Sequence, residues 1–202
     1  MHKNSYSKMK WFKDTYLSKE KKLEILDVGS LDHSGEYNYR NIFNEENWNY
    51  TGLDIQAGNN VDIVVSDIYN WYEVEDNSYD VVISGQFFEH LEFFWLTMNQ
   101  IERVLNPGGL LCIIVPSAGP KHGGKMLNCY RFHEDGLKAM AKYVDFEIIN
   151  ATVDTDENTK PWFDACLIAK KTGLKGLANT KDIENRMNNL ELKLDKLLER
   201  IQ

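Results

Sequence analysis

Short apolar runs recur along the chain, and each of them is cut off by Gly, Asp or Pro. They span residues 23–29, 50–55, 61–67, 79–85 and 110–116. These runs are rich in β-branched residues and lack the polar alternation of a strand with one face in water. Strands of this kind are typical of a parallel sheet that is covered on both faces.

Residues with a helical period lie between two of these runs. A spacing of three or four positions marks one buried stripe, formed by Leu91, Phe94, Met98, Ile101 and Leu105. The segment 106–109, Asn-Pro-Gly-Gly, is expected to end that helix. Residues 133–144 predict a further helix. Residues 1–22, polar with a few aromatic side chains, predict an entry helix that lies on the domain.

Two late apolar segments, 146–153 and 163–171, predict the last strands. Only a loop separates them, so we expect an antiparallel hairpin at the edge of the sheet. With the elements before them, they predict an α/β fold built on a doubly wound, mostly parallel sheet of seven strands. We assign residues 23–172 to this domain.

The composition changes after Gly173. We expect a linker over 173–180 and a coiled-coil helix over 181–202. The apolar residues of this helix are alternately four and three positions apart, which is a heptad pattern: Ile183, Met187, Leu190, Leu194, Leu197 and Ile201. A helix packed on its own domain is the alternative, but the residues between these are nearly all polar. We therefore expect a homo-oligomer, with a dimer favoured over a trimer.

The charge of the chain excludes some classes of partner. The formal net charge is −8 and the isoelectric point is near 5.2. A nucleic-acid-binding surface is basic, so we expect neither a nucleic-acid partner nor docking on an anionic membrane. No secretory signal or membrane-spanning segment can be recognised. Cys112, Cys129 and Cys166 fit neither a disulfide framework nor a zinc site, which favours the reducing cytoplasm.

Acidic residues follow three successive strands. Asp27 and Gly29 end the first, Asp54 ends the second, and Asp67 ends the third. In an open α/β sheet, ligands bind beyond the carboxyl ends of the strands. Asp27 and the loop amides after it can hold a charged group, Asp54 can accept from two ribose hydroxyls, and Asp67 can accept from a base amino group. A single acid there is more often a helix cap, but the set predicts a nucleoside site.

These segments resemble the class I methyltransferases that use S-adenosylmethionine (SAM). YDVVISGQFFEHLEFFW (79–95), IERVLNPGGLLCIIVPSAG (101–119) and CYRFHEDGLKAMAKY (129–143) extend the resemblance, which is greatest to the bacterial branch often called type 11. It implies SAM as cofactor, S-adenosylhomocysteine as product, and SAM contacts by Asp27, Gly29, Ser30, Asp54, Ile55, Asp67, Ile68, Gly85 and Gln86. The chain departs from the family at Leu31, where a second glycine is usual; this narrows access for the methionine end of SAM.

Two loops supply candidates for the chemistry and the substrate. Methyl transfer to a hydroxyl needs a positioned nucleophile and a group that accepts its proton. A histidine that titrates near neutrality suits this role, and the candidates are His90, His122 and His133, each with a capping, packing or solvated alternative. The candidate substrate contacts are Glu89, Lys121, Tyr130 and Arg131. Basic residues gather in the second loop, which favours an anionic substrate or simply a solvated loop. Glu89 and His90 alone are too little for a metal site, so no metal is expected.

Three functions remain open. The first is O-methylation of a sugar or glycan intermediate, because similar type 11 sequences commonly accompany cell-surface polysaccharide synthesis. The second is methylation of another small acidic metabolite. The third is an inactive SAM-binding scaffold protein, for which Leu31 is the best support. A nicotinamide dehydrogenase is disfavoured, because no G-x-G-x-x-G motif follows the first strand.

Overall fold

A computed structural model describes residues 2–32, 35, 37–122 and 126–173. The chain divides into one unit of residues 1–171 and another of residues 172–202. The predicted coiled coil and, apart from Gly173, the predicted linker lie outside the described residues. None of the described helices has the length and apolar character needed to cross a membrane.

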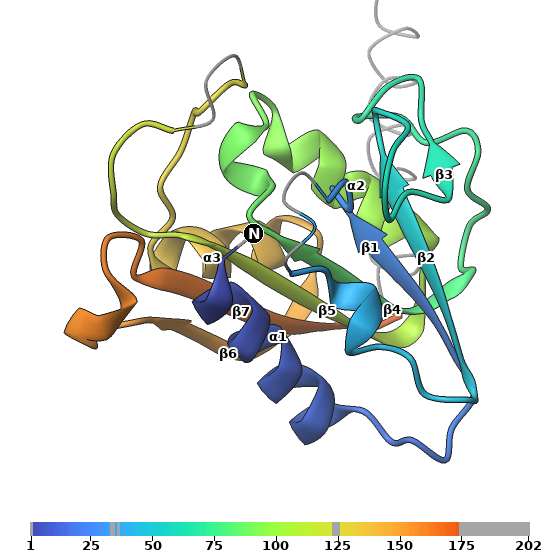
Figure 1. Ribbon diagram of the computed structural model, residues 1–202. Coiled ribbons are helices and arrows are strands. Elements are labelled where there is room, and N and C mark those ends of the chain that lie inside the picture. The colour runs from blue at the N-terminus through green and yellow to red at the C-terminus, as the bar shows by residue number, and fades with distance from the viewer. Residues whose placement is uncertain (1, 33–34, 36, 123–125, 174–202) are drawn as a thin grey trace, which may run out of the picture. The chain divides into compact units, whose positions relative to one another are not determined.

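The first unit contains one sheet of seven strands (Figure 1). In chain order they are β1 (Leu23–Val28), β2 (Trp48–Asp54), β3 (Ile63–Val64), β4 (Tyr79–Gly85), β5 (Leu105–Pro116), β6 (Phe146–Val153) and β7 (Asp164–Lys171). Their order in space is β3-β2-β1-β4-β5-β7-β6. The strands from β3 to β5 are parallel, whereas β7 pairs antiparallel with both β5 and β6. The predicted mostly parallel sheet and its antiparallel hairpin are confirmed.

The two faces of the sheet carry separate apolar clusters. One face packs against α2 (Phe94–Val104) and α3 (Glu134–Tyr143), and the other packs against α1 (Lys3–Tyr16), as Figure 1 shows. Neighbouring residues of a strand alternate between these clusters: in β1, Leu26 and Val28 face α2 and α3, while Ile25 faces α1. Because every central strand is buried on both faces, its apolar runs are continuous, as the sequence pattern indicated.

Three connections differ from the predicted alternation of strands and helices. No α-helix lies between β1 and β2, between β2 and β3, or between β3 and β4 in the residues that the structure describes. Between β1 and β2, the short 3₁₀ helix η1 (Tyr39–Asn41) takes that place, and the nearly fully buried Tyr39 and Phe43 fill the face of the sheet. This segment is polar with scattered aromatic residues, so large rings rather than a helical stripe cover the strands there.

The third strand is shorter than predicted. Only Ile63 and Val64 pair with β2, not the whole run 61–67. The Asp67 carboxylate accepts a hydrogen bond of 2.8 Å from the backbone N–H of Tyr69, which turns the chain away from the sheet. Since β3 is an edge strand with one neighbour, few backbone bonds oppose this turn.

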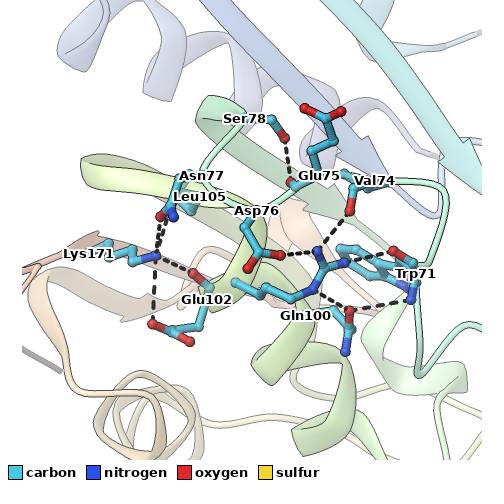
Figure 2. A network of polar contacts seen from close by, with 11 residues as sticks. Trp71, Val74, Glu75, Asp76, Asn77, Ser78, Gln100, Glu102, Leu105 and Lys171 are labelled. Carbon is cyan, nitrogen blue, oxygen red and sulfur yellow. Dashed lines mark hydrogen bonds and ion pairs between the residues drawn. The ribbon is translucent and has the colours of Figure 1, made fainter. Parts of the chain in front are cut away.

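A polar network joins α2 to the loop before β4 (Figure 2). The guanidinium of Arg103 donates to the carbonyl oxygens of Val74 and Trp71 at 2.8 and 2.7 Å, and it also binds the Asp76 carboxylate. This side chain therefore satisfies backbone acceptors of a long irregular segment that has no partner strand of its own.

Lys171 is a second cation of this network, and it binds the C-terminal end of α2. The ammonium of Lys171, at the end of β7, donates to the carbonyl oxygens of Glu102 and Leu105 at 2.6 and 2.8 Å. These carbonyls belong to the last turn of α2 and the residue after it, which lack partners within the helix. A positive charge at this position also interacts favourably with the negative end of the helix dipole.

We expect Arg103→Met to lower the free energy of unfolding by about 1–3 kcal/mol, because the aliphatic stem remains while two backbone carbonyls lose their donor. Chemical denaturation monitored by circular dichroism measures the change. Lys138→Met is the matched control: Lys138 pairs with Asp135 on an exposed helix surface, so little change is expected. Equal destabilisation by both substitutions would contradict this role of Arg103.

Candidate functional site

A pocket of about 450 Å³ lies at the carboxyl ends of β1, β2 and β4. The loop after β1 supplies Gly29 and Ser30, and Asp54 ends β2. Gly85 and Gln86 come from the end of β4. Parallel strands bring their carboxyl ends to one edge of the sheet, so residues far apart in the sequence meet there.

The backbone of Gly29 makes the first loop possible. Its φ is +79°, a conformation that residues with a side chain rarely adopt. A Cβ at this position would also lie 2.2 Å from Cγ of Phe87, which follows β4. Glycine is therefore required both by the turn and by the ring that covers it.

Leu31 also lies at the pocket, but its side chain is directed to the loop after β2. A Cβ on Gly58 would lie 2.4 Å from Cδ1 of Leu31, so the missing side chain at Gly58 makes room for the leucine. The backbone N–H of Leu31 donates to the Asp54 carboxylate at 3.1 Å. Leu31, which stands where similar methyltransferases have a glycine, is thus accommodated by the absence of a side chain at Gly58.

Asp27 is a buried carboxylate in a polar network below the first loop. The hydroxyl of Tyr50 donates to it, and Asn60 in turn donates to the Tyr50 hydroxyl at 3.2 Å. Burial raises the pKa of Asp27 to about 7 despite the hydrogen bond from Tyr50, and the nearby Asp54 contributes to the rise. Asp27 therefore changes its charge near neutral pH.

Asp54 and Asp67 occupy different surroundings. Asp54 is 7% exposed and accepts from the N–H groups of Leu31 and Gln56 at 3.1 and 3.2 Å, with the pocket beside it. Asp67 is exposed and binds the N–H of its own turn, and it does not line the pocket. Its neighbour Ile68 does line it.

Most of the predicted cofactor contacts come together in the pocket. Asp67 is outside it, and the lining contains the other eight: Asp27, Gly29, Ser30, Asp54, Ile55, Ile68, Gly85 and Gln86. Of the predicted catalytic residues, only His90 lines the pocket, and none of the predicted substrate contacts does.

Glu89, His90 and His122 form a cluster beside the pocket, and His90 is the member that lines it. One possible ligand atom from each residue lies within 4.8 Å of the other two. The rings of His90 and His122 have centroids 5.3 Å apart. Burial lowers the pKa of His122, to which His90 and Arg131 contribute, and burial raises the pKa of Glu89 to about 8. The first two residues follow β4, whereas His122 comes from the loop after β5.

Arg131 and Tyr130 stabilise the loop that carries His122. Arg131 donates to the carbonyl oxygens of Tyr130 and Pro120 at 2.7 and 2.6 Å, and its guanidinium lies 5.9 Å from the ring centroid of Trp162. The Tyr130 hydroxyl donates to the Glu92 carbonyl at 2.8 Å. Both residues thus bind backbone rather than facing the pocket.

The other basic residues of the loop after β5 do not join the cluster of Glu89, His90 and His122 in the part of the chain that the structure describes. Lys121 is exposed, and Lys125 lies outside the described residues. His133 is exposed at the residue before α3 and does not belong to the cluster of Glu89, His90 and His122.

Other residues of the pocket carry no signal in the sequence. Tyr39, Tyr69, Phe87, Met126 and Leu127 are among the other lining residues, and each lies outside the strands and α-helices. The aromatic residues Phe93 and Trp95, 45% and 38% exposed, lie in a row with Tyr69. The high aromatic content of residues 87–95 was the only available sign.

The fold is that of the class I methyltransferases. Residues 26–113 match the family model described as a methyltransferase domain. None of the curated proteins compared with the chain matches it significantly.

Several solved structures share the fold. A SAM-dependent methyltransferase from Aquifex aeolicus is 15% identical, with a TM-score of 0.60 over 83% of this chain and 90% of that one. One from Methanosarcina mazei is 17% identical, with a TM-score of 0.57 over 78% and 95%. The cyclase SpnF is 17% identical, with a TM-score of 0.58 over 74% of each chain. At identities this low, the structural similarity establishes the fold and nothing more. The cyclase illustrates that the fold alone leaves the reaction open.

The match to a methyltransferase domain, together with the SAM-dependent methyltransferases that share the fold, supports a methyltransferase enzyme with SAM as its cofactor. The residues of the pocket fit this cofactor: Asp27 can accept from the ammonium of SAM, and Asp54 from the ribose hydroxyls. Ile55 and Ile68 provide apolar contacts for the adenine.

We expect Asp54→Ala to weaken SAM binding by about 1.5–3 kcal/mol, because hydrogen bonds between a carboxylate and the ribose are lost. Asp67→Ala is the matched control and should change the affinity little, since Asp67 lies outside the pocket. Isothermal titration calorimetry measures both, with thermal unfolding as the check on folding. A larger loss with Asp67→Ala would contradict this assignment.

We also expect SAM-site affinity to depend on pH through Asp27. The ionised carboxylate pairs with the ammonium group, so affinity should be constant above about pH 8. It should fall by up to about tenfold per pH unit below pH 6, because the pKa near 7 means that the free protein is then protonated. Calorimetry with S-adenosylhomocysteine from pH 5.5 to about pH 8.5 tests this. Asp27→Asn should remove the dependence, and an unchanged pH profile in that variant would refute it.

Proposed function

We propose that this enzyme transfers the methyl group of SAM to a hydroxyl of a sugar or glycan intermediate. The observation that carries the proposal is that the pocket suited to SAM has His90 in its wall, with Glu89 and His122 next to it. SAM is already activated, so the protein needs to align the acceptor oxygen and provide for the loss of its proton.

The cluster of Glu89, His90 and His122 provides for that proton. The lowered pKa of His122 favours a neutral imidazole at neutral pH, which is the form that accepts a proton. His90 is the member that lines the pocket. His133 has no part in the proposal, because it lies apart at the start of α3.

Exposed aromatic rings beside the pocket support a sugar as the acceptor. Tyr69 lines the pocket, and Phe93 and Trp95 continue the row at centroid distances of 5.6 and 5.7 Å. Flat rings stack on the apolar C–H faces of sugars, while their surroundings can bind the hydroxyls. The resemblance to methyltransferases that accompany glycan synthesis points in the same direction.

A small acidic metabolite has less support from the geometry. Arg131, the residue best suited to bind a carboxylate or phosphate, directs two of its donors to backbone carbonyl oxygens. Lys121 remains as an exposed cation near the cluster. An inactive scaffold also has less support, because Leu31 packs toward Gly58.

The proposal includes a dimer formed by the coiled coil over residues 181–202, which rests on the heptad pattern alone. It also includes a cytoplasmic location, which three free cysteines favour.

Incubation with SAM labelled in the methyl group tests the substrate class. We would compare a panel of nucleotide sugars and oligosaccharides with a panel of small carboxylates and phosphates, followed by mass spectrometry of the products. Labelled sugar methyl ethers would support the proposal. Label in the acidic metabolites only, or SAM binding without any product, would replace it by the second or the third function.

We expect His90→Ala and His122→Ala to lower kcat by about 100-fold or more, with SAM affinity unchanged within a few-fold. His133→Ala is the comparison and should retain its rate, because that side chain is exposed and distant from the cluster. Steady-state kinetics across pH 6–9 provide the measurement. Full activity of both cluster variants would show that positioning alone supports the reaction.

A further inference from the structure

We propose that Glu89, His90 and His122 bind one divalent transition-metal ion next to the SAM pocket. One ligand atom from each residue lies within 4.8 Å of the other two, and the Glu89 carboxylate is 3.6 Å from Nε2 of His90. Donors bound tetrahedrally to a single Zn²⁺ at 2.0–2.1 Å are about 3.3 Å apart. A contraction of the cluster by side-chain rotation would therefore close it around an ion.

The burial of Glu89 is independent support for a cation. The residue is 0% exposed, and neither carboxylate oxygen has a hydrogen-bond partner among the described residues. An ionised carboxylate in such a place is strongly unfavourable unless a cation faces it. A metal ion would supply that charge and would bind both the carboxylate and the Nε2 of His90 that faces it at 3.6 Å.

His90 is oriented as a ligand. Its Nδ1 lies 2.5 Å from the carbonyl oxygen of Leu127, so the Nδ1–H donates there and the Nε2 lone pair faces Glu89. Metal-binding histidines typically donate their other ring N–H to a carbonyl or carboxylate, which holds the ring in place. The backbone of Glu89 is held as well, because its carbonyl accepts from the N–H of Cys129 at 2.7 Å.

His122 is held against the same cluster from the opposite loop. Its ring packs on Trp162 with centroids 4.5 Å apart, and Asn128 and Arg131 contact its Nδ1 at 3.3 and 3.4 Å. Both contacts are long for hydrogen bonds, and together with the Trp162 ring they hold the imidazole beside Glu89 and His90.

The ligand set selects the class of ion. Two imidazoles and one carboxylate suit Zn²⁺, Fe²⁺ or Mn²⁺, whereas Mg²⁺ and Ca²⁺ prefer oxygen ligands. Three protein ligands also leave a coordination position open, as in catalytic zinc sites. His90 also lines the pocket, so the cluster adjoins the space in which a substrate would bind.

The role of the ion rests on the proposed function. A hydroxyl oxygen of the acceptor would bind the ion, which lowers the pKa of the hydroxyl, and its proton would pass to water. The oxygen would then form a bond to the methyl carbon as the bond from carbon to sulfur breaks. The electron pair of that bond stays on sulfur and yields the thioether of S-adenosylhomocysteine. His90 and His122 would act as ligands in this case, and direct proton transfer to a histidine would describe the metal-free enzyme.

Metal binding can be measured without activity. The full-length, tag-free protein is treated with a chelator and then dialysed against Zn²⁺, Mn²⁺ or Mg²⁺ at tens of micromolar, with bound metal determined by mass spectrometry. We expect one Zn²⁺ per chain and no retained Mg²⁺. Co²⁺ should give the visible absorption bands of a site with nitrogen and oxygen ligands. Glu89→Gln and His122→Ala should each weaken Zn²⁺ binding by about 100-fold, while Glu92→Gln, an exposed carboxylate nearby, should not.

The outcomes separate the two proposals. A wild-type chain that retains no ion, or equal Zn²⁺ binding by wild type, Glu89→Gln and His122→Ala, would overturn the metal site. His122→Ala keeps this test valid if the buried Glu89 variant does not fold, because His122 is partly exposed in a loop. Methylation of a sugar in the presence of chelator would overturn the metal site and leave the proposed function intact. Stoichiometric Zn²⁺ binding without sugar methylation would overturn the proposed function and leave the metal site intact.

Discussion

The burial of the sheet on both faces is the constraint on which the pocket depends. The middles of strands β1 and β4 are mostly apolar and are covered by α1 on one side and by α2 and α3 on the other. Polar groups that can face a ligand therefore gather toward the carboxyl ends of these strands. Asp27 and Gln86 lie at such ends, and the parallel register places them at one edge. The position of the pocket is a consequence of the packing that stabilises the fold.

The walls of the pocket depend on contacts from segments that are far away in the sequence. The Gln86 side chain donates to Asp164 at 3.0 Å, and Asp164 also accepts from Asn4 in α1. The Glu89 carbonyl accepts from the N–H groups of Cys129 and Tyr130. The residues after β4 are thus held by the N-terminal helix, by the loop after β5 and by the start of β7. We infer that this part of the pocket is rigid only when the whole domain is folded.

The two halves of the site are suited to different tasks. The half formed by β1 and β2 carries carboxylates and backbone groups of the kind that can bind a nucleoside with a charged end. The half formed by Glu89, His90 and His122 has three titratable groups, of which Glu89 is fully buried. In the proposed function, this second half and the aromatic row of Tyr69, Phe93 and Trp95 contact the substrate.

The sequence by itself determined the strands, the mostly parallel sheet and most residues that line the pocket at its edge, because continuous apolar runs ending in Asp or Gly reflect local burial and turn geometry. It did not show that Asp67 would bind its own turn, since a carboxylate after a strand reads the same whether it faces a ligand or a backbone N–H. It also did not show the aromatic cover formed by Tyr39, nor the meeting of His122 with Glu89, which lies 33 positions earlier. Only the tertiary structure decided these, because loops without a period are positioned by contacts with distant residues.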